Sequence, residues 1–187
     1  VISLDNLRLA DEKARKGKLR TYGVQLHDKH REEHILSLHE SLKNGTFKTS
    51  KYHVFTIFEP KERQIYQLPY FPDRILHHAV MNILEPIWVS IFTRDTYSCI
   101  KNRGIHACAK DVKKALKQDK EGTKYCLKID VRKFYPSINH EVLKGVVRRK
   151  IKDSRLFALL DEIIDSDVNT DIPIRNFVTD SETGELV

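Results

Sequence analysis

Apolar residues recur at helical spacing along most of the chain. This spacing predicts helices over residues 5–16 and 28–43, and Asn44 and Gly45 supply a stop for the second of them. A longer helix begins at Pro72, whose missing N–H costs little in a first helical turn. It carries a wide apolar stripe suited to facing a core, made of Ile75, Leu76, Ala79, Val80, Ile83, Leu84 and Ile87.

In two places the pattern changes to one in which successive side chains point to alternate faces, as in a β-strand. On either side of a polar turn at residues 59–62, β-branched and aromatic residues alternate, which predicts a β-hairpin with a basic tip at Lys61 and Arg63. Residues 125–130 alternate again. They predict a short strand that delivers an acid, Asp130, at its end.

Helical spacing returns in the second half of the chain, at residues 105–116, 142–151 and 156–164. Strands and helices therefore mix without alternating one for one. This order favours a helix-rich α+β fold over a doubly wound sheet.

Length and composition fit a soluble globular protein. The 187 residues are enough for one domain with a core, or for one domain plus a small appendage. Apolar residues make up 40% and charged residues 32%, which argues against intrinsic disorder. No apolar run approaches the roughly 20 residues that cross a bilayer, and no signal peptide is visible, so we expect a cytoplasmic protein without a membrane partner. The start at Val1 without methionine suggests a piece of a longer protein.

The charge of the chain favours a polyanionic partner. Its formal net charge is +7 and its pI is near 9.3, and each Lys or Arg placed on a phosphate releases counterions. The three cysteines are odd in number and lack the spacing of a zinc site or of a disulfide framework.

Asp130 is the residue with the clearest chemical meaning. An acid at the end of a buried strand is costly unless a charge compensates it, and a divalent metal does so most effectively. Mg²⁺ prefers hard oxygen ligands, usually one or two carboxylates together with phosphate oxygens. An Asp that merely caps the turn after a strand is the alternative.

The residues around Asp130 resemble motif A of reverse transcriptases. That motif is a strand ending in hydrophobic–Asp–hydrophobic–x–x–aromatic–aromatic–x–Ser–Ile, and it is matched here by Ile129, Asp130, Val131, Phe134, Tyr135, Ser137 and Ile138. By this resemblance Asp130 is a catalytic ligand of Mg²⁺, of which the intact enzyme uses two, and the Val131 carbonyl shares a metal. Phe134 and Tyr135 then belong to the nucleotide site, and Tyr135 takes the steric-gate position that excludes a 2′-OH. A largely buried ring is expected at Tyr135 in either role, as gate or as core aromatic.

Residues 61–88 resemble the first block of the same family. In that block a basic hairpin of the fingers holds the triphosphate of the incoming nucleotide and leads into a helix that opens with Asp-Arg-Ile. Arg63 matches the triphosphate arginine, and Lys61 is the looser candidate for a second contact. Arginine suits this role because its planar fork binds phosphate bidentately. A solvated hairpin tip is the alternative for both residues.

Residues 92–112 resemble the second block, so that three blocks occur in the family's order. The resemblance implies that Lys101 and Arg103 lie near template or primer phosphates. Gly104 would permit a close backbone approach or a positive φ. His106 is expected to start the following helix.

The resemblance as a whole implies a right-hand polymerase fold, with a helical lead-in at 1–50, fingers at 51–122 and a partial palm at 123–187. The implied activity is that of an RNA-directed DNA polymerase, which adds dNTPs to a nucleic-acid primer along template RNA. The sequences of the three blocks most resemble those of bacterial and phage retroelements, among them diversity-generating retroelements. Retrons and group II introns are related families. A diversity-generating element would add a basic accessory protein as a partner.

The chain departs from the family in two respects. The segment that should form motif B keeps Ile172, Pro173 and Ile174 but has Arg175 where the family has glycine. No Tyr–x–Asp–Asp, which carries the remaining catalytic carboxylates, is present. One carboxylate is a poor site for two metals, so the chain alone is expected to be inactive.

Two rival functions remain beside the polymerase. One is a nucleic-acid-binding relative that no longer polymerises. The other is a reverse-transcriptase-like phage-defence protein that makes DNA without a template.

Overall fold

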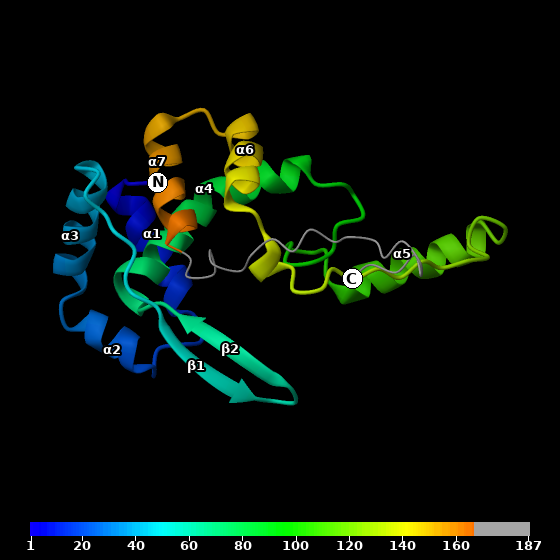
Figure 1. Cartoon of the computed structure of the whole chain (residues 1–187), viewed down its shortest axis with the longest axis horizontal. Helices are drawn as coiled ribbons and strands as arrows, with labels where there is room; N and C mark the ends of the chain where they lie inside the picture. The colour runs from blue at the N-terminus through cyan, green and yellow to red at the C-terminus, as the bar shows by residue number, and fades with distance from the viewer. Residues whose placement is uncertain (167–187) are drawn as a thin grey trace, which may run out of the picture. The chain divides into compact units, whose positions relative to one another are not determined.

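The computed structural model describes residues 1–166. It is a helix-rich α+β structure with one two-stranded antiparallel hairpin (Figure 1). The helices are α1 (Leu4–Arg15), α2 (Tyr22–Asp28), α3 (Arg31–Lys43), α4 (Ile75–Ile91), α5 (Ile105–Gln118), α6 (His140–Lys150) and α7 (Ser154–Asp165). The strands are β1 (His53–Phe58) and β2 (Glu62–Gln67), and short irregular helical turns occupy Tyr70–Arg74 and Tyr135–Ser137.

The chain divides into two compact units. The first unit consists of Val1–His39 and Tyr70–Asp130, and the second of Glu40–Pro69 together with the residues from Val131 on. Among the described residues, no helix combines the length and the apolar character needed to span a membrane.

The core of the first unit lies between α1 and α4. Both helices bury one apolar stripe, which contains Leu7, Ala10, Ala14, Ile75, Leu76, Ala79, Val80 and Leu84. The small alanines let the two helices approach closely, and Asn6 Nδ2 donates to the Ala79 carbonyl at 3.0 Å. The predicted stripe of α4 is confirmed except at its far end, where Ile83 and Ile87 are exposed.

A buried carboxylate, Asp11, joins α1 to the segments that follow it. Its side chain is fully buried and is surrounded by four polar groups: Arg15 Nη2 at 2.9 Å, Arg31 Nε at 2.7 Å, the Tyr70 hydroxyl at 2.6 Å and His27 Nε2 at 3.4 Å. Burial alone would raise the pKa of Asp11, but its polar neighbours outweigh burial and hold the pKa well below its ordinary value. The cluster therefore ties α1, α2, α3 and the turn before α4 together.

The second predicted helix, at 28–43, corresponds to α3, which begins three residues later at Arg31, and the preceding α2 was not predicted. The predicted stop of α3 is confirmed. Gly45 has φ +66, its N–H donates to the Leu42 carbonyl, and the Thr46 N–H donates to the Ser41 carbonyl. This pair of bonds is a Schellman motif, in which glycine adopts the left-handed conformation at little cost.

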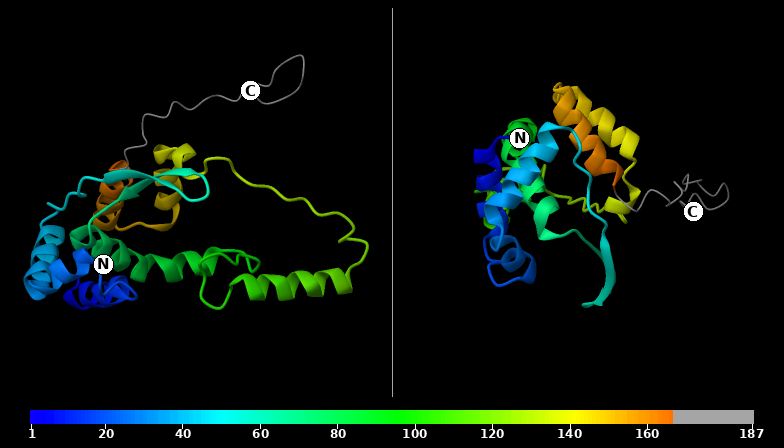
Figure 2. Two further views of the ribbon diagram at one scale, coloured as in Figure 1. Left: turned by 90° about the horizontal axis from the view of Figure 1, so that it is seen from below. Right: turned by 90° about the vertical axis from the view of Figure 1, so that its left-hand side faces the viewer.

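In the second unit, α6 and α7 form a helical hairpin and lie side by side in both views of Figure 2. Asn139 and Asp153 cap the two helices, each accepting a backbone N–H three residues on. Lys144, which is nearly buried, pairs with Asp165 of α7 at 2.7 Å. The carboxylate of Glu162 holds the segment before the hairpin by accepting from Lys48 Nζ and from the Thr49 N–H.

The predicted strand at 125–130 is wrong in the described structure, where these residues form no regular element. Tyr125, Leu127, Ile129 and Val131 are between 62% and 86% exposed. A strand needs a neighbour to satisfy its N–H and C=O groups, and no described segment pairs with this one. The expectations for motif B, at residues 172–179, lie outside the described residues.

Candidate functional site

The predicted β-hairpin is confirmed as an element, and it presents the two predicted basic side chains. β1 and β2 pair from His53 with Gln67 to Phe58 with Glu62, which leaves a three-residue turn that contains Lys61. Arg63 stands on β2 opposite Ile57. Both cations are exposed, and neither has an acidic partner within the described residues.

Period-two geometry places Arg63 on one face of the hairpin with Phe55, Ile57 and Ile65. The guanidinium group thus rises from an apolar surface. A guanidinium group is more weakly hydrated than an ammonium group, which suits Arg63 to bind a phosphate. Lys61 lies in the turn and does not share this apolar face.

The loop before α5 carries Lys101, Arg103 and Gly104. Lys101 is exposed, and Arg103 Nη1 donates to the Thr93 carbonyl at 3.4 Å, which closes the loop on itself. The positive φ considered for Gly104 is wrong, whereas the close approach of template or primer to its backbone stays a prediction. Its φ is −92°, and a Cβ there would meet nothing within 4 Å.

Two non-glycine residues of this loop, Cys99 and Asn102, have the positive φ instead, at 57° and 65°. Asn tolerates this region better than most residues because its short side chain bonds locally. His106 lies in the first turn of α5, as expected.

Tyr97 anchors the loop to α5. Its hydroxyl donates to Asp111 Oδ2 at 2.8 Å, and this bond raises the pKa of Tyr97 to about 12. The tyrosine therefore stays protonated and donating at neutral pH. The sequence alone does not reveal this contact, because a hydrogen bond across 14 residues has no periodic signal.

Removing this hydroxyl by Tyr97→Phe is expected to loosen the loop without unfolding the first unit. Amide hydrogen exchange of residues 93–104 should speed up severalfold, because local opening no longer breaks the bond to Asp111. Tyr22→Phe removes the hydroxyl of a tyrosine that is 77% exposed and serves as the control. Equal exchange rates in the two variants would contradict the anchoring role.

Asp130 ends the irregular segment that replaces the predicted strand. Its side chain is exposed and has no hydrogen-bonding partner among the described residues. It belongs to the first compact unit, and Val131 begins the second. The capping role weighed for Asp130 finds no support here, because the carboxylate caps no described turn.

Phe134 and Tyr135 follow in a tight turn of the second unit. Their rings meet edge to face at 5.3 Å between centroids. The Ser137 hydroxyl donates to the Phe134 carbonyl at 2.9 Å and closes the turn. The expectation that the Tyr135 ring is largely buried is wrong, since its exposed fraction is 81%. An exposed ring on a closed turn has room to meet a ligand.

The described residues contain no group of three or more His, Cys, Asp or Glu side chains placed to hold a metal ion. The acids of α7 are engaged elsewhere, Asp161 with Arg148 at 3.5 Å and Asp165 with Lys144. Asp130 thus supplies one hard oxygen ligand without a second carboxylate beside it.

Comparison with known proteins supports a relationship to retroelement reverse transcriptases at low identity, without indicating a subtype. No protein-family model matches the chain. Over 131 residues, 69% of this chain and 21% of the relative, it is 27% identical to the group II intron-encoded protein LtrA of Lactococcus lactis subsp. cremoris. It is also 31% identical over 94 residues, 50% of this chain, to protein YkfC of Escherichia coli K12. The matched residues span about a fifth to a quarter of the length of these relatives.

Proposed function

We propose that this chain is the fingers and part of the palm of an RNA-directed DNA polymerase. In the intact enzyme a primer 3′-OH attacks the α-phosphate of a dNTP, and pyrophosphate leaves. The observation that carries the proposal is the order of three motif blocks along the chain, with Asp130 free of other partners in the last of them. The match to a group II intron-encoded protein supports it.

Asp130 is proposed as a ligand of at least one of two Mg²⁺, together with the Val131 carbonyl. Such ions supply Lewis-acid activation and charge neutralisation in phosphoryl transfer. The described residues do not by themselves fit a two-metal centre, because they contain no group of three or more His, Cys, Asp or Glu side chains placed to hold a metal ion. The chain alone is therefore expected to be inactive.

The nucleotide contacts are proposed for the hairpin and the aromatic turn. Arg63 binds the triphosphate with its planar fork, and Lys61 adds a second, weaker contact. Tyr135 packs beneath the sugar with Phe134 at its edge. Lys101 and Arg103 meet template or primer phosphates from the loop before α5, which Tyr97 holds in place.

Shortening the gate by Tyr135→Ala is expected to raise the use of ribonucleotides. The ratio of kcat/KM for dNTP over rNTP should fall by about 10- to 200-fold, since removal of a steric clash of this size changes discrimination by that much. Single-nucleotide incorporation with matched dNTP and rNTP measures it. Tyr125→Ala, which removes another exposed ring, should leave the ratio unchanged. An unaltered ratio in Tyr135→Ala would contradict the steric-gate role of Tyr135.

The proposed function is tested by primer extension with the protein that contains this chain. A labelled DNA primer on an RNA template should be extended with dNTPs and Mg²⁺, stop with a chelator and resume when Mg²⁺ is restored. The 187-residue chain should give no product under the same conditions. Extension by that chain alone would contradict the expectation that it lacks the carboxylates needed to hold two Mg²⁺.

A nucleic-acid-binding relative without polymerase activity is the second candidate. The net charge of +7 favours it. It predicts RNA binding by the intact protein without extension. We further propose that the intact protein belongs to a diversity-generating retroelement, has a basic accessory protein as a partner and is cytoplasmic.

A further inference from the structure

The turn between α6 and α7 concentrates positive charge. Residues 148–155 hold five cations and one acid, and they lie outside the three motif blocks. Arg149, Lys150 and Arg155 are exposed and have no acidic partner among the described residues. Unpaired cations this close together repel one another. A bound polyanion is attracted to them and also reduces the repulsion between them.

The support beneath these cations is well ordered. Ile151 is buried, Lys152 Nζ donates to the Arg148 carbonyl at 3.0 Å, and Asp153 caps α7. The turn therefore presents its charges from a fixed backbone. A ligand that binds there does not have to order the turn first.

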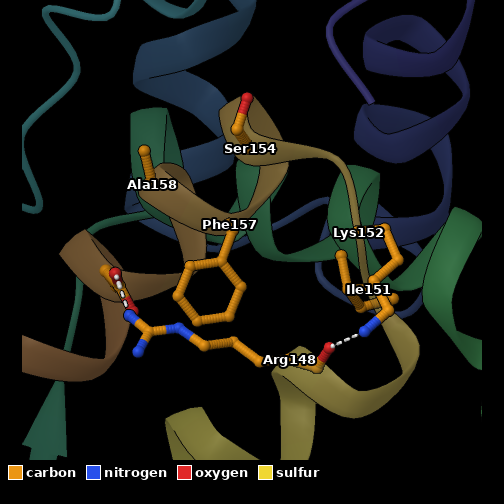
Figure 3. A pocket seen from close by; sticks show the side chains of 7 residues that line it. Arg148, Ile151, Lys152, Ser154, Phe157 and Ala158 are labelled. Atoms are coloured by element: carbon orange, nitrogen blue, oxygen red, sulfur yellow. Dashed lines mark hydrogen bonds and ion pairs between the residues drawn. The ribbon is translucent and has the colours of Figure 1, made fainter.

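The guanidinium group of Arg148 lies over an aromatic ring beside this turn. Its guanidinium carbon lies 4.3 Å from the centroid of the Phe157 ring, and Nη2 lies 3.5 Å from Asp161 Oδ2. Figure 3 shows the Arg148 side chain running along the ring. One face of the guanidinium group meets Phe157, while the side chain remains 56% exposed.

An open hollow of about 450 Å³ lies at this stack, and both Arg148 and Phe157 line it (Figure 3). Ile151 and Ala158 add apolar surface, and Lys152 and Ser154 add polar groups at its rim. A planar group that enters the hollow can stack on the guanidinium plane, as unpaired bases do on arginine.

We infer that the α6–α7 turn binds single-stranded RNA. Arg149, Lys150 and Arg155 neutralise backbone phosphates, and one unpaired base stacks on Arg148 in the hollow. An acidic protein would satisfy the charges but would leave the hollow and the planar Arg148 without a use. The choice of RNA over other single strands rests on the proposed function, in which the template is RNA.

The phosphate contacts are tested by anisotropy of a fluorescent 16-nucleotide oligouridine, in chelator and without dNTP. The triple change R149Q, K150Q and R155Q should weaken binding at least about tenfold near 0.1 M salt. It should also lower the slope of log K against log salt by about 2, at roughly 0.7 for each phosphate that the protein no longer neutralises. The control change K16Q, K18Q and R20Q removes the same charge from an exposed loop of the first unit. It should alter binding less than threefold. Equal losses of affinity in the two variants would reduce the effect to net charge and overturn the inference.

The stacking contact is tested by Arg148→Lys, which keeps the charge and removes the plane. Affinity should fall about tenfold, because base stacking carries an effect of that size, and the salt slope should not change. Tighter binding of a duplex than of a single strand, or of oligodeoxyuridine than of oligouridine, would overturn the assignment. Circular dichroism and thermal melting establish that each variant is folded. Asp130→Asn should bind like the wild type, so failure here is distinguishable from failure of the polymerase proposal.

Discussion

Replacing Asp130 by Asn is expected to lower primer extension by the intact enzyme more than a thousandfold. The substitution keeps the size of the side chain and removes its charge, so the metal loses a hard anionic ligand. Metal stabilisation of the transition state is worth several kcal/mol, and each 1.36 kcal/mol is a factor of ten in rate. The loss should appear in kcat, with primer-template binding unchanged.

The matched control for this substitution is Glu121→Gln. Glu121 is exposed, lies nine residues earlier in the same compact unit, and its side chain has no partner among the described residues. It should keep full activity. If Asp130→Asn retained more than a tenth of the wild-type rate, Asp130 would not be a catalytic ligand, and a solvated acid after a turn would be the better interpretation.

Replacing Asp11 by Ala is expected to lower the free energy of unfolding of the first unit by about 3–5 kcal/mol. Removing one partner of a buried ion pair leaves the others desolvated and unpaired. Here Arg15 retains Asp28 at 2.8 Å and the Tyr70 hydroxyl retains the backbone carbonyl of residue 11 at 3.1 Å. Arg31 Nε loses its acceptor, and the buried His27 loses the carboxylate beside it. Urea unfolding followed by circular dichroism measures the change.

Asp5→Ala is the control for Asp11→Ala, because Asp5 lies on the same helix with a fully exposed side chain. Its effect should stay within about 0.5 kcal/mol. Similar losses of stability from both substitutions would show that the buried cluster contributes nothing special.

The Asp11 cluster also predicts a direction of pH dependence. The pKa of Asp11 is lowered on folding from its ordinary value of 3.8. Its contribution is therefore complete above about pH 4 and is lost as the pH falls below that value. Asp11→Ala should remove this part of the acid sensitivity.

Much of the helical architecture and the hairpin could be predicted, because their patterns are local. The stripe of α4, the stop at Gly45 and the pairing around Ile57 each follow from spacing or turn chemistry within a few residues. Asp11 was missed because an acid at one helical position is indistinguishable from a solvated one. Only the distant Arg31 and Tyr70 make it a buried anchor.

The strand expected at 125–130 shows what a local pattern cannot predict. Its alternation from Tyr125 to Ile129 satisfies every local rule for a strand, yet pairing is a property of two segments. No described segment supplies the second. In the candidate site, Asp130 and Arg63 could be named from motifs, but the exposed surroundings of Asp130 could not be predicted.

The central claim, that the intact protein copies RNA into DNA, is tested most directly by single-nucleotide incorporation. Four RNA templates that differ only in the first templating base are each offered the four dNTPs separately in Mg²⁺. The account predicts addition of the complementary dNTP alone on every template. Addition regardless of the templating base would favour the untemplated phage-defence function, and RNA binding without any addition would favour the binding relative.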